Sequence, residues 1–149
     1  MEIRIAEEKD VPELFSMESV CFPDPWSQKS LRDTLKEPCS FFAVAYEEDM
    51  LLGYINTTYV LDELNLNRIC VLPEYRRTGA GSRLMEAMFS FAEEKKIASI
   101  FLEVRLSNLP AQKLYERFGF ETVGKRRNFY TAPVEDGLVM MAKLPRKGS

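Results

Sequence analysis

The sequence predicts an α/β domain in which a mixed sheet carries helices on both faces. Three observations favour this class. Alternating apolar residues predict antiparallel strands in the first half of the chain, strand–helix–strand order dominates the second half, and a glycine-rich turn joins a strand to a helix. With 149 residues, 46% of them hydrophobic, the chain fits a single domain over residues 1–149, of which we expect 145–149 to be a frayed tail.

The N-terminal quarter is expected to form one short strand and two helices. Apolar and charged residues alternate around positions 3–5, which is typical of a strand. Asp10 and Glu13 have the spacing of a capping box, so a helix is expected to begin there. Ser27 has the position of an N-cap for a second helix, which Pro38 ends.

The rest of the chain alternates between strands and helices. Apolar runs bounded by turn residues indicate the strands, and apolar residues on one helical face indicate the helices. Gly119 is expected to close the second of these helices. The expected elements are strands 41–46, 51–59 and 64–72, a helix from about residue 81, strand 99–105, a helix over 111–118, and strands 120–126 and 138–144.

Composition excludes several classes of protein. The net charge of −3 and pI of about 5.2 argue against a nucleic-acid binder that works by bulk electrostatics. The chain has no histidine and its three cysteines lack metal-site spacing, so a Cys/His zinc site and a histidine-based triad are excluded. An odd number of cysteines without a signal peptide fits a reducing cytoplasm, and no apolar stretch is long enough to span a membrane. We expect a soluble, cytoplasmic protein, monomeric and without a metal.

The segment Arg76-Arg77-Thr78-Gly79-Ala80-Gly81 is a candidate anion site between a strand and a helix. Two glycines allow a tight turn whose N–H groups converge on one ligand, and the helix N-terminus adds a positive dipole. The arginines supply positive charge, so a pyrophosphate is the expected ligand. The Gly-Lys-[Ser/Thr] sequence of nucleotide-triphosphate loops is missing. The alternative is a surface turn with solvated arginines.

This turn resembles the pyrophosphate loop of the GNAT N-acetyltransferases. The downstream segments Glu103-Val104-Arg105-x-Ser107-Asn108 and Leu114-Tyr115-Glu116-x-x-Gly119-Phe120 are similar to the second half of the same family's core. The resemblance extends in order over essentially the whole chain. It implies the GNAT fold, with a mostly antiparallel sheet of about six to seven strands, and acetyl-CoA as cosubstrate without a metal. The cofactor contacts implied are Ile69, Cys70, Val71, Arg76, Arg77, Thr78, Gly79, Ala80, Gly81, Ser82 and Asn108.

A closer resemblance is to the bacterial ribosomal-protein-alanine N-acetyltransferases (RimI type). The segment Phe22 to Ser27, the block Arg126 to Tyr130, and Glu135-Asp136 carry it. In that pattern Pro-Trp usually follows the phenylalanine directly, whereas here Asp24 is inserted. The resemblance implies that the acceptor is the α-amino group of a small-subunit ribosomal protein that begins with alanine.

Two residues are candidate catalysts. Glu103 is expected to lie on the opposite face of its strand from the aliphatic residues around it, near the strand's carboxyl end. The resemblance implies that it is the general base, against the alternative of a solvated or arginine-paired carboxylate. Tyr115 belongs to an apolar helical stripe and could be a core residue, but the resemblance implies a general acid.

The acceptor side is expected to involve Trp26 and Tyr130, which could equally be packing residues. Cys70 lacks a histidine to activate it, so direct attack in a ternary complex is favoured over a covalent route. Two alternatives stay open: acetylation of a small amine such as a polyamine, amino sugar or antibiotic, and a non-catalytic acetyl-CoA-binding module.

Overall fold

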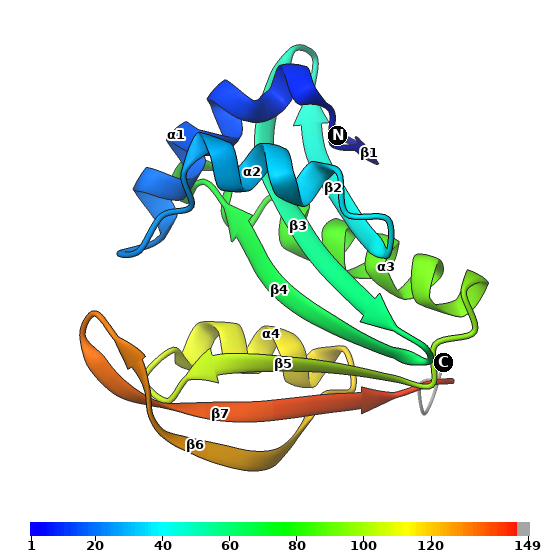
Figure 1. The fold of residues 1–149 in the computed structure, drawn as a ribbon, viewed down its shortest axis with the longest axis vertical. Helices are drawn as coiled ribbons and strands as arrows, with labels where there is room; N and C mark the ends of the chain where they lie inside the picture. Colours follow the sequence, from blue (N-terminus) through cyan, green and yellow to red (C-terminus); the bar gives the residue numbers. More distant parts are fainter. Residues whose placement is uncertain (146–149) are drawn as a thin grey trace.

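The computed structural model, which describes residues 1–145, shows a seven-stranded sheet between two layers of helices (Figure 1). The strand order is β1-β2-β3-β4-β5-β7-β6. The strands are β1 (Glu2–Ile5), β2 (Ser40–Glu47), β3 (Met50–Val60), β4 (Glu63–Val71), β5 (Ser99–Arg105), β6 (Glu121–Thr131) and β7 (Val134–Lys143). The α-helices are α1 (Val11–Cys21), α2 (Gln28–Leu35), α3 (Ala80–Glu94) and α4 (Leu109–Arg117), and two short 3-10 turns cover Glu8–Asp10 and Pro73–Tyr75.

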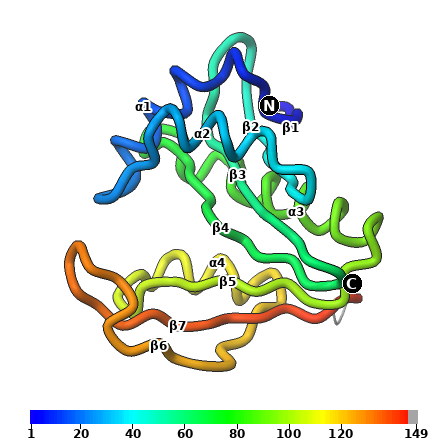
Figure 2. Tube along the Cα trace, viewed as in Figure 1, coloured from blue at the N-terminus to red at the C-terminus, as the bar shows by residue number. Residues whose placement is uncertain are grey.

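The pairing of β4 with β5 differs from the rest of the sheet. The other described strand pairs are antiparallel, whereas β4 and β5 run parallel and pair at three positions, the last of which is Asn65 with Phe101. Beyond that point the two strands diverge, as both views of the chain show (Figures 1 and 2). The divergence opens the middle of the sheet at the carboxyl ends of the two strands.

Two hydrophobic cores occupy the two faces of the sheet. Helices α1 and α2 cover one face, where Leu14 and Leu31 pack on β-strand residues such as Tyr54. Helices α3 and α4 cover the other face, where Met88 and Phe118 join the core. Strand β2 shows the result, because consecutive residues 43–45 are all fully buried, as expected for a strand covered on both sides.

The predicted order of elements is confirmed, and two local signals act as expected. The Ser27 hydroxyl accepts a hydrogen bond from Ser30 N at 3.0 Å, which caps α2. Gly119 follows α4 with a φ of +89°, a conformation that favours glycine. Among residues 1–145, no helix combines the length and apolar character needed to cross a membrane.

Two structural predictions are wrong in detail. Asp10 does not cap α1 with its side chain. Instead its carboxylate accepts from Glu7 N at 2.8 Å and pairs with Arg4. The capping box is therefore formed by Glu7 and Asp10, one turn earlier than predicted. The last two strands are longer than predicted and form a hairpin over 121–143. The sequence underpredicted their length because register shifts at 122–124 and 126–130 interrupt the alternation that marks a strand. Of the predicted frayed tail, residues 146–149 lie outside the described part of the chain.

Candidate active site

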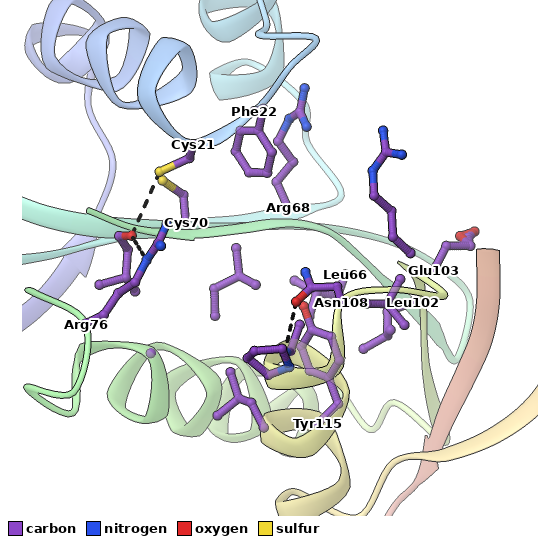
Figure 3. Close-up of a pocket in the computed structure, with 18 of the residues that line it drawn as sticks. Cys21, Phe22, Leu66, Arg68, Cys70, Arg76, Leu102, Glu103, Asn108 and Tyr115 are labelled. Atoms are coloured by element: carbon purple, nitrogen blue, oxygen red, sulfur yellow. Dashed lines mark hydrogen bonds between the residues drawn. The ribbon is translucent and has the colours of Figure 1, made fainter. Parts of the chain in front are cut away.

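A cleft of about 990 Å³ lies where β4 and β5 diverge. Its walls come from β4, the turn before α3, β5, the start of α4 and the loop that follows α1 (Figure 3). The structure brings most of the predicted cofactor residues to this cleft: Ile69, Cys70, Val71, Arg76, Arg77, Gly79, Gly81, Ser82 and Asn108. The predicted catalytic pair, Glu103 and Tyr115, lines the same cleft.

The glycine-rich turn forms the end of the cleft nearest α3. Gly79 has a φ of +90° and precedes the helix, and its carbonyl accepts the first bond of the helix, from Arg83 N at 2.9 Å. The amides of 80–82 come before that bond, so they have no acceptor within the helix. Gly81 and Ser82 line the cleft, which places helix N–H groups at its edge. This is the geometry of an anion site.

The remaining loop residues shape the turn. The Thr78 hydroxyl donates to Tyr75 O at 2.5 Å, and Ala80 is buried in the core beneath α3. Arg76 Nε donates to Val71 O at 3.1 Å, which ties the loop to the end of β4. Thr78 and Ala80 therefore support the turn, whereas Arg76 and Arg77 line the cleft with positive charge.

Glu103 enters the cleft from one face of the sheet. Along β5, Ile100, Leu102 and Val104 are buried, whereas Glu103 is exposed on the opposite face, as the alternation predicts. The Glu103 carboxylate acts on the neighbouring hydroxyl of Tyr130: burial and the negative charge of Glu103 raise the pKa of Tyr130 to about 12. Glu103 thus supplies an exposed negative charge beside Tyr130.

Tyr115 enters the cleft from the other face of the sheet. It lies on α4, is 7% exposed, and its ring packs against Phe120. Burial and the neighbouring Tyr130 raise the pKa of Tyr115 above its usual value, so its hydroxyl holds its proton at neutral pH. Asn108 caps the same helix by accepting from Ala111 N at 3.2 Å.

Arg105 binds Tyr130 and the tip of the β6–β7 hairpin and holds both beside the cleft. Its guanidinium lies 4.4 Å from the centre of the Tyr130 ring and donates to Pro133 O at 3.0 Å and to Glu135 at 3.3 Å. Glu135 in turn accepts from Ser107 N at 2.7 Å, at the start of the turn into α4. The resemblance marked these segments, but no pattern in the sequence predicted that they bind each other.

The loop after α1 is held by a buried ion pair that sequence reasoning missed. The Glu18 carboxylate is fully buried, accepts from Trp26 N at 2.6 Å and from the Tyr54 hydroxyl, and lies 3.3 Å from Arg68 Nε. Burial raises the pKa of Glu18, although the bond from Trp26 N and the charge of Arg68 oppose that rise. The Arg68 guanidinium lies between two rings, 4.1 Å from Phe22 and 4.4 Å from Trp26.

This contact fits the alternative stated for Trp26, that of a packing residue. Phe22, Pro23 and Asp24 line the cleft, whereas the Trp26 ring packs on the Arg68 guanidinium. Tyr130 lines the cleft as predicted and also borders a smaller hollow of about 370 Å³ with Glu103 and Phe129. The face of the sheet that carries Glu103 is therefore bordered by aromatic side chains from the loop after α1 and from β6.

The cleft between the diverging parallel strands thus has a glycine turn at one end, and a carboxylate and a tyrosine enter it from opposite faces of the sheet. The chain belongs to the acetyltransferase (GNAT) family, whose model matches residues 11–120.

Similar proteins narrow the comparison within that family. The ribosomal protein bS18-alanine N-acetyltransferase of Escherichia coli (strain K12) is 35% identical over 136 residues, which cover 90% of this chain and 91% of that protein. A Bacillus subtilis (strain 168) relative is 34% identical over 133 residues, covering 89% of this chain and 88% of the relative. The crystal structure of the ribosomal-protein-S18-alanine N-acetyltransferase from Escherichia coli superposes with a TM-score of 0.89 at 31% identity, covering 99% of this chain and 96% of that one.

Proposed function

We propose that this acyltransferase moves an acetyl group from acetyl-CoA to the α-amino group of a protein, and that the acceptor is the N-terminal alanine of a small-subunit ribosomal protein. One observation carries the proposal: Glu103 and Tyr115 reach the same cleft from opposite faces of the sheet. A base and an acid on opposite sides of one cleft suit a transfer in which one proton leaves an amine and another reaches a thiolate. The names of the Escherichia coli relatives support the choice of acceptor.

The cleft fits acetyl-CoA, the acyl donor of the GNAT family. The helix amides at Gly81 and Ser82, with Arg76 and Arg77 beside them, would hold the pyrophosphate. The β5 ladder ends at Asn65, so later β4 residues have a free edge on that side for an amide-rich chain. Bound acetyl-CoA supplies an activated thioester, and a backbone N–H near Val71 would stabilise negative charge on its carbonyl oxygen.

Glu103 would accept the proton from the attacking amine, directly or through water. An α-amino group has a pKa of about 7.7–8.0, so a modest base at neutral pH is sufficient. The exposed position of Glu103 beside Tyr130 leaves its carboxylate open to an incoming N-terminus. The segment Phe22 to Asp24 and the Tyr130 ring would border an extended peptide there.

Tyr115 would protonate the departing sulfur, because it lines the cleft and its hydroxyl carries a proton at neutral pH. Direct attack is favoured over a covalent route through Cys70. A hydrogen bond with Cys21, together with burial, raises the pKa of Cys70 above its usual value, and this makes it a poor nucleophile.

A coenzyme A release assay tests the proposal. Peptides that differ in the first residue are compared with the same peptides blocked at the N-terminus, and with spermidine and an aminoglycoside. We expect turnover to be fastest on the alanine peptide and to vanish when its N-terminus is blocked. Turnover on a small amine and on none of the peptides would contradict the choice of acceptor.

Matched variants test the two catalytic roles. Glu103→Gln and Tyr115→Phe should each lower kcat about 100-fold, within the range of general acid–base catalysis. Glu121→Gln and Tyr59→Phe, which make the same chemical changes away from the cleft, should leave kcat unchanged. Full turnover by both site variants would refute the assignment.

A further inference from the structure

Two cysteines that the acetyl-transfer proposal does not use as reactants lie together in the wall of the cleft. Cys21 is the last residue of α1, and Cys70 lies near the end of β4. Figure 3 shows their sulfur atoms side by side, and each thiol shifts the pKa of the other. Both are free, and both line the cleft. Residues far apart in the sequence thus form a dithiol at the site.

The two thiols differ in access and acidity. Cys21 is half-buried and reachable from the cleft, whereas Cys70 is 3% exposed. The hydrogen bond from Cys70 and the nearby positive charge of Arg76 lower the pKa of Cys21 to about 7 against the opposing effect of burial. Its partner Cys70 has a raised pKa and remains a thiol. Cys21 is therefore the nucleophile of the pair, since the thiolate is the reactive form.

We propose that Cys21 and Cys70 are a redox-reactive modification site, which a hydroperoxide oxidises to an intramolecular disulfide in the wall of the cleft. The two sulfur atoms already lie side by side, as a disulfide between them requires. The pair also has the arrangement of many redox-sensitive cysteines, an accessible thiolate beside a second thiol that can resolve it. Cys39, the third cysteine, is exposed at the start of β2 and has no such neighbour among the described residues.

The oxidation balances with one equivalent of hydroperoxide. The Cys21 thiolate attacks the terminal oxygen, the O–O bond breaks, and Cys21 becomes a sulfenic acid while the leaving oxygen takes up a proton. The Cys70 sulfur then attacks the sulfenic sulfur, the S–O bond breaks, and the departing hydroxide takes the proton of Cys70 and leaves as water. Both thiols are oxidised and the peroxide is reduced, with hydrogen peroxide giving two waters.

The disulfide would constrain both sides of the cleft. Cys21 Sγ lies 3.9 Å from Val71 O, the same oxygen that accepts from Arg76 of the anion loop. Cys21 also precedes Phe22, which covers Arg68 at the acceptor side. A covalent bond to Cys70 would fix the end of α1 against β4. We expect oxidation to lower the rate of acetyl transfer, measured by coenzyme A release, about fivefold. Dithiothreitol should restore that rate. This consequence rests on the proposed function.

Thiol chemistry tests the site without any enzyme assay. The protein is treated with a small excess of hydrogen peroxide at pH 7, alkylated, digested and mapped by mass spectrometry with and without dithiothreitol. We expect a reducible link between the peptides that contain Cys21 and Cys70, while Cys39 stays alkylated. Reaction at Cys21 should be about tenfold faster than at a thiol of ordinary pKa, since such a thiol is a few per cent ionised at pH 7.

Cys21→Ser and Cys70→Ser should each abolish the link, and Cys39→Ser should leave it intact. Mapping of the unaltered protein keeps the test valid should Cys70→Ser fail to fold. Oxidation of Cys21 to a sulfinic acid with Cys70 still free, a link through Cys39, or no reaction would overturn the proposal. A link that forms without slowing coenzyme A release would overturn the inhibitory effect alone. Absence of acetyl transfer before oxidation would instead count against the proposed function.

Discussion

The buried pair Glu18–Arg68 gives a quantitative prediction about how the acceptor side is held. Glu18→Gln keeps an oxygen that can accept from Trp26 N but removes the negative charge 3.3 Å from Arg68 Nε. Breaking a buried ion pair typically costs about 3–5 kcal/mol. The glutamine keeps the bond from Trp26 N, and its neutral side chain avoids the desolvation cost of the buried carboxylate. We therefore expect Glu18→Gln to lower the free energy of unfolding by only about 2 kcal/mol.

Arg68→Met is the companion variant, since it fills similar volume while leaving Glu18 charged and buried. We expect it to cost about 3 kcal/mol. The double variant should cost less than the sum, with a coupling energy of about 2 kcal/mol measured by urea unfolding followed by circular dichroism. The single variants should also raise KM for the acceptor peptide more than KM for acetyl-CoA, because Arg68 contacts Phe22, Trp26 and the Asp24 carbonyl. Additivity within about 0.5 kcal/mol would refute this account of the loop.

Three further predictions follow from single residues. Gly79→Ala should cost about 1 kcal/mol by thermal unfolding and weaken acetyl-CoA binding, because alanine is strained at a φ of +90°, whereas Gly124→Ala, where an added Cβ would make ordinary contact, should change neither. Burial alone would raise the pKa of Asp10, but hydrogen bonds from Arg4 and Glu7 N outweigh it and hold that pKa below its usual value. The stabilisation is therefore complete above the usual pKa and is lost as pH falls through the folded-state pKa, so the cost of Asp10→Asn in urea unfolding should shrink between about pH 5 and pH 2; a constant cost would contradict the pairing. The rate at which iodoacetamide alkylates Cys21 should rise with pH around a midpoint near pH 7, and a midpoint near that of an ordinary thiol would contradict its contact with Cys70 and Arg76.

Local signals in the sequence were enough to predict much of the fold and part of the site. Ser27 and Gly119 act through neighbouring backbone groups, so their positions alone predicted a cap and a helix end. The alternation around Glu103 predicted its face because strand geometry fixes the direction of each side chain.

Interactions between distant segments were not predictable in the same way. Glu18 lies on a helix that carries one other acidic residue, Glu13, and nothing near Glu18 in the sequence indicates a partner 50 positions later. Cys21 and Cys70 meet because α1 packs across β4, which is a property of the assembled sheet. The full length of the hairpin over 121–143 was not predicted, because its register shifts remove the two-residue alternation on which strand prediction depends.

The short parallel ladder between β4 and β5 has a consequence for the order of folding. The hairpins of β2 to β4 and of β6 with β7 join segments close in sequence, whereas the β4–β5 ladder forms after the chain has crossed through α3. The cleft lies at this junction, so a chain whose two halves are not joined has no place for the acyl donor. Binding of acetyl-CoA would therefore favour the fully joined chain by RT ln(1 + [L]/Kd), about 2.7 kcal/mol at a hundredfold excess over Kd. The cell's acetyl-CoA level would thus act on the assembly of the protein as well as on its turnover.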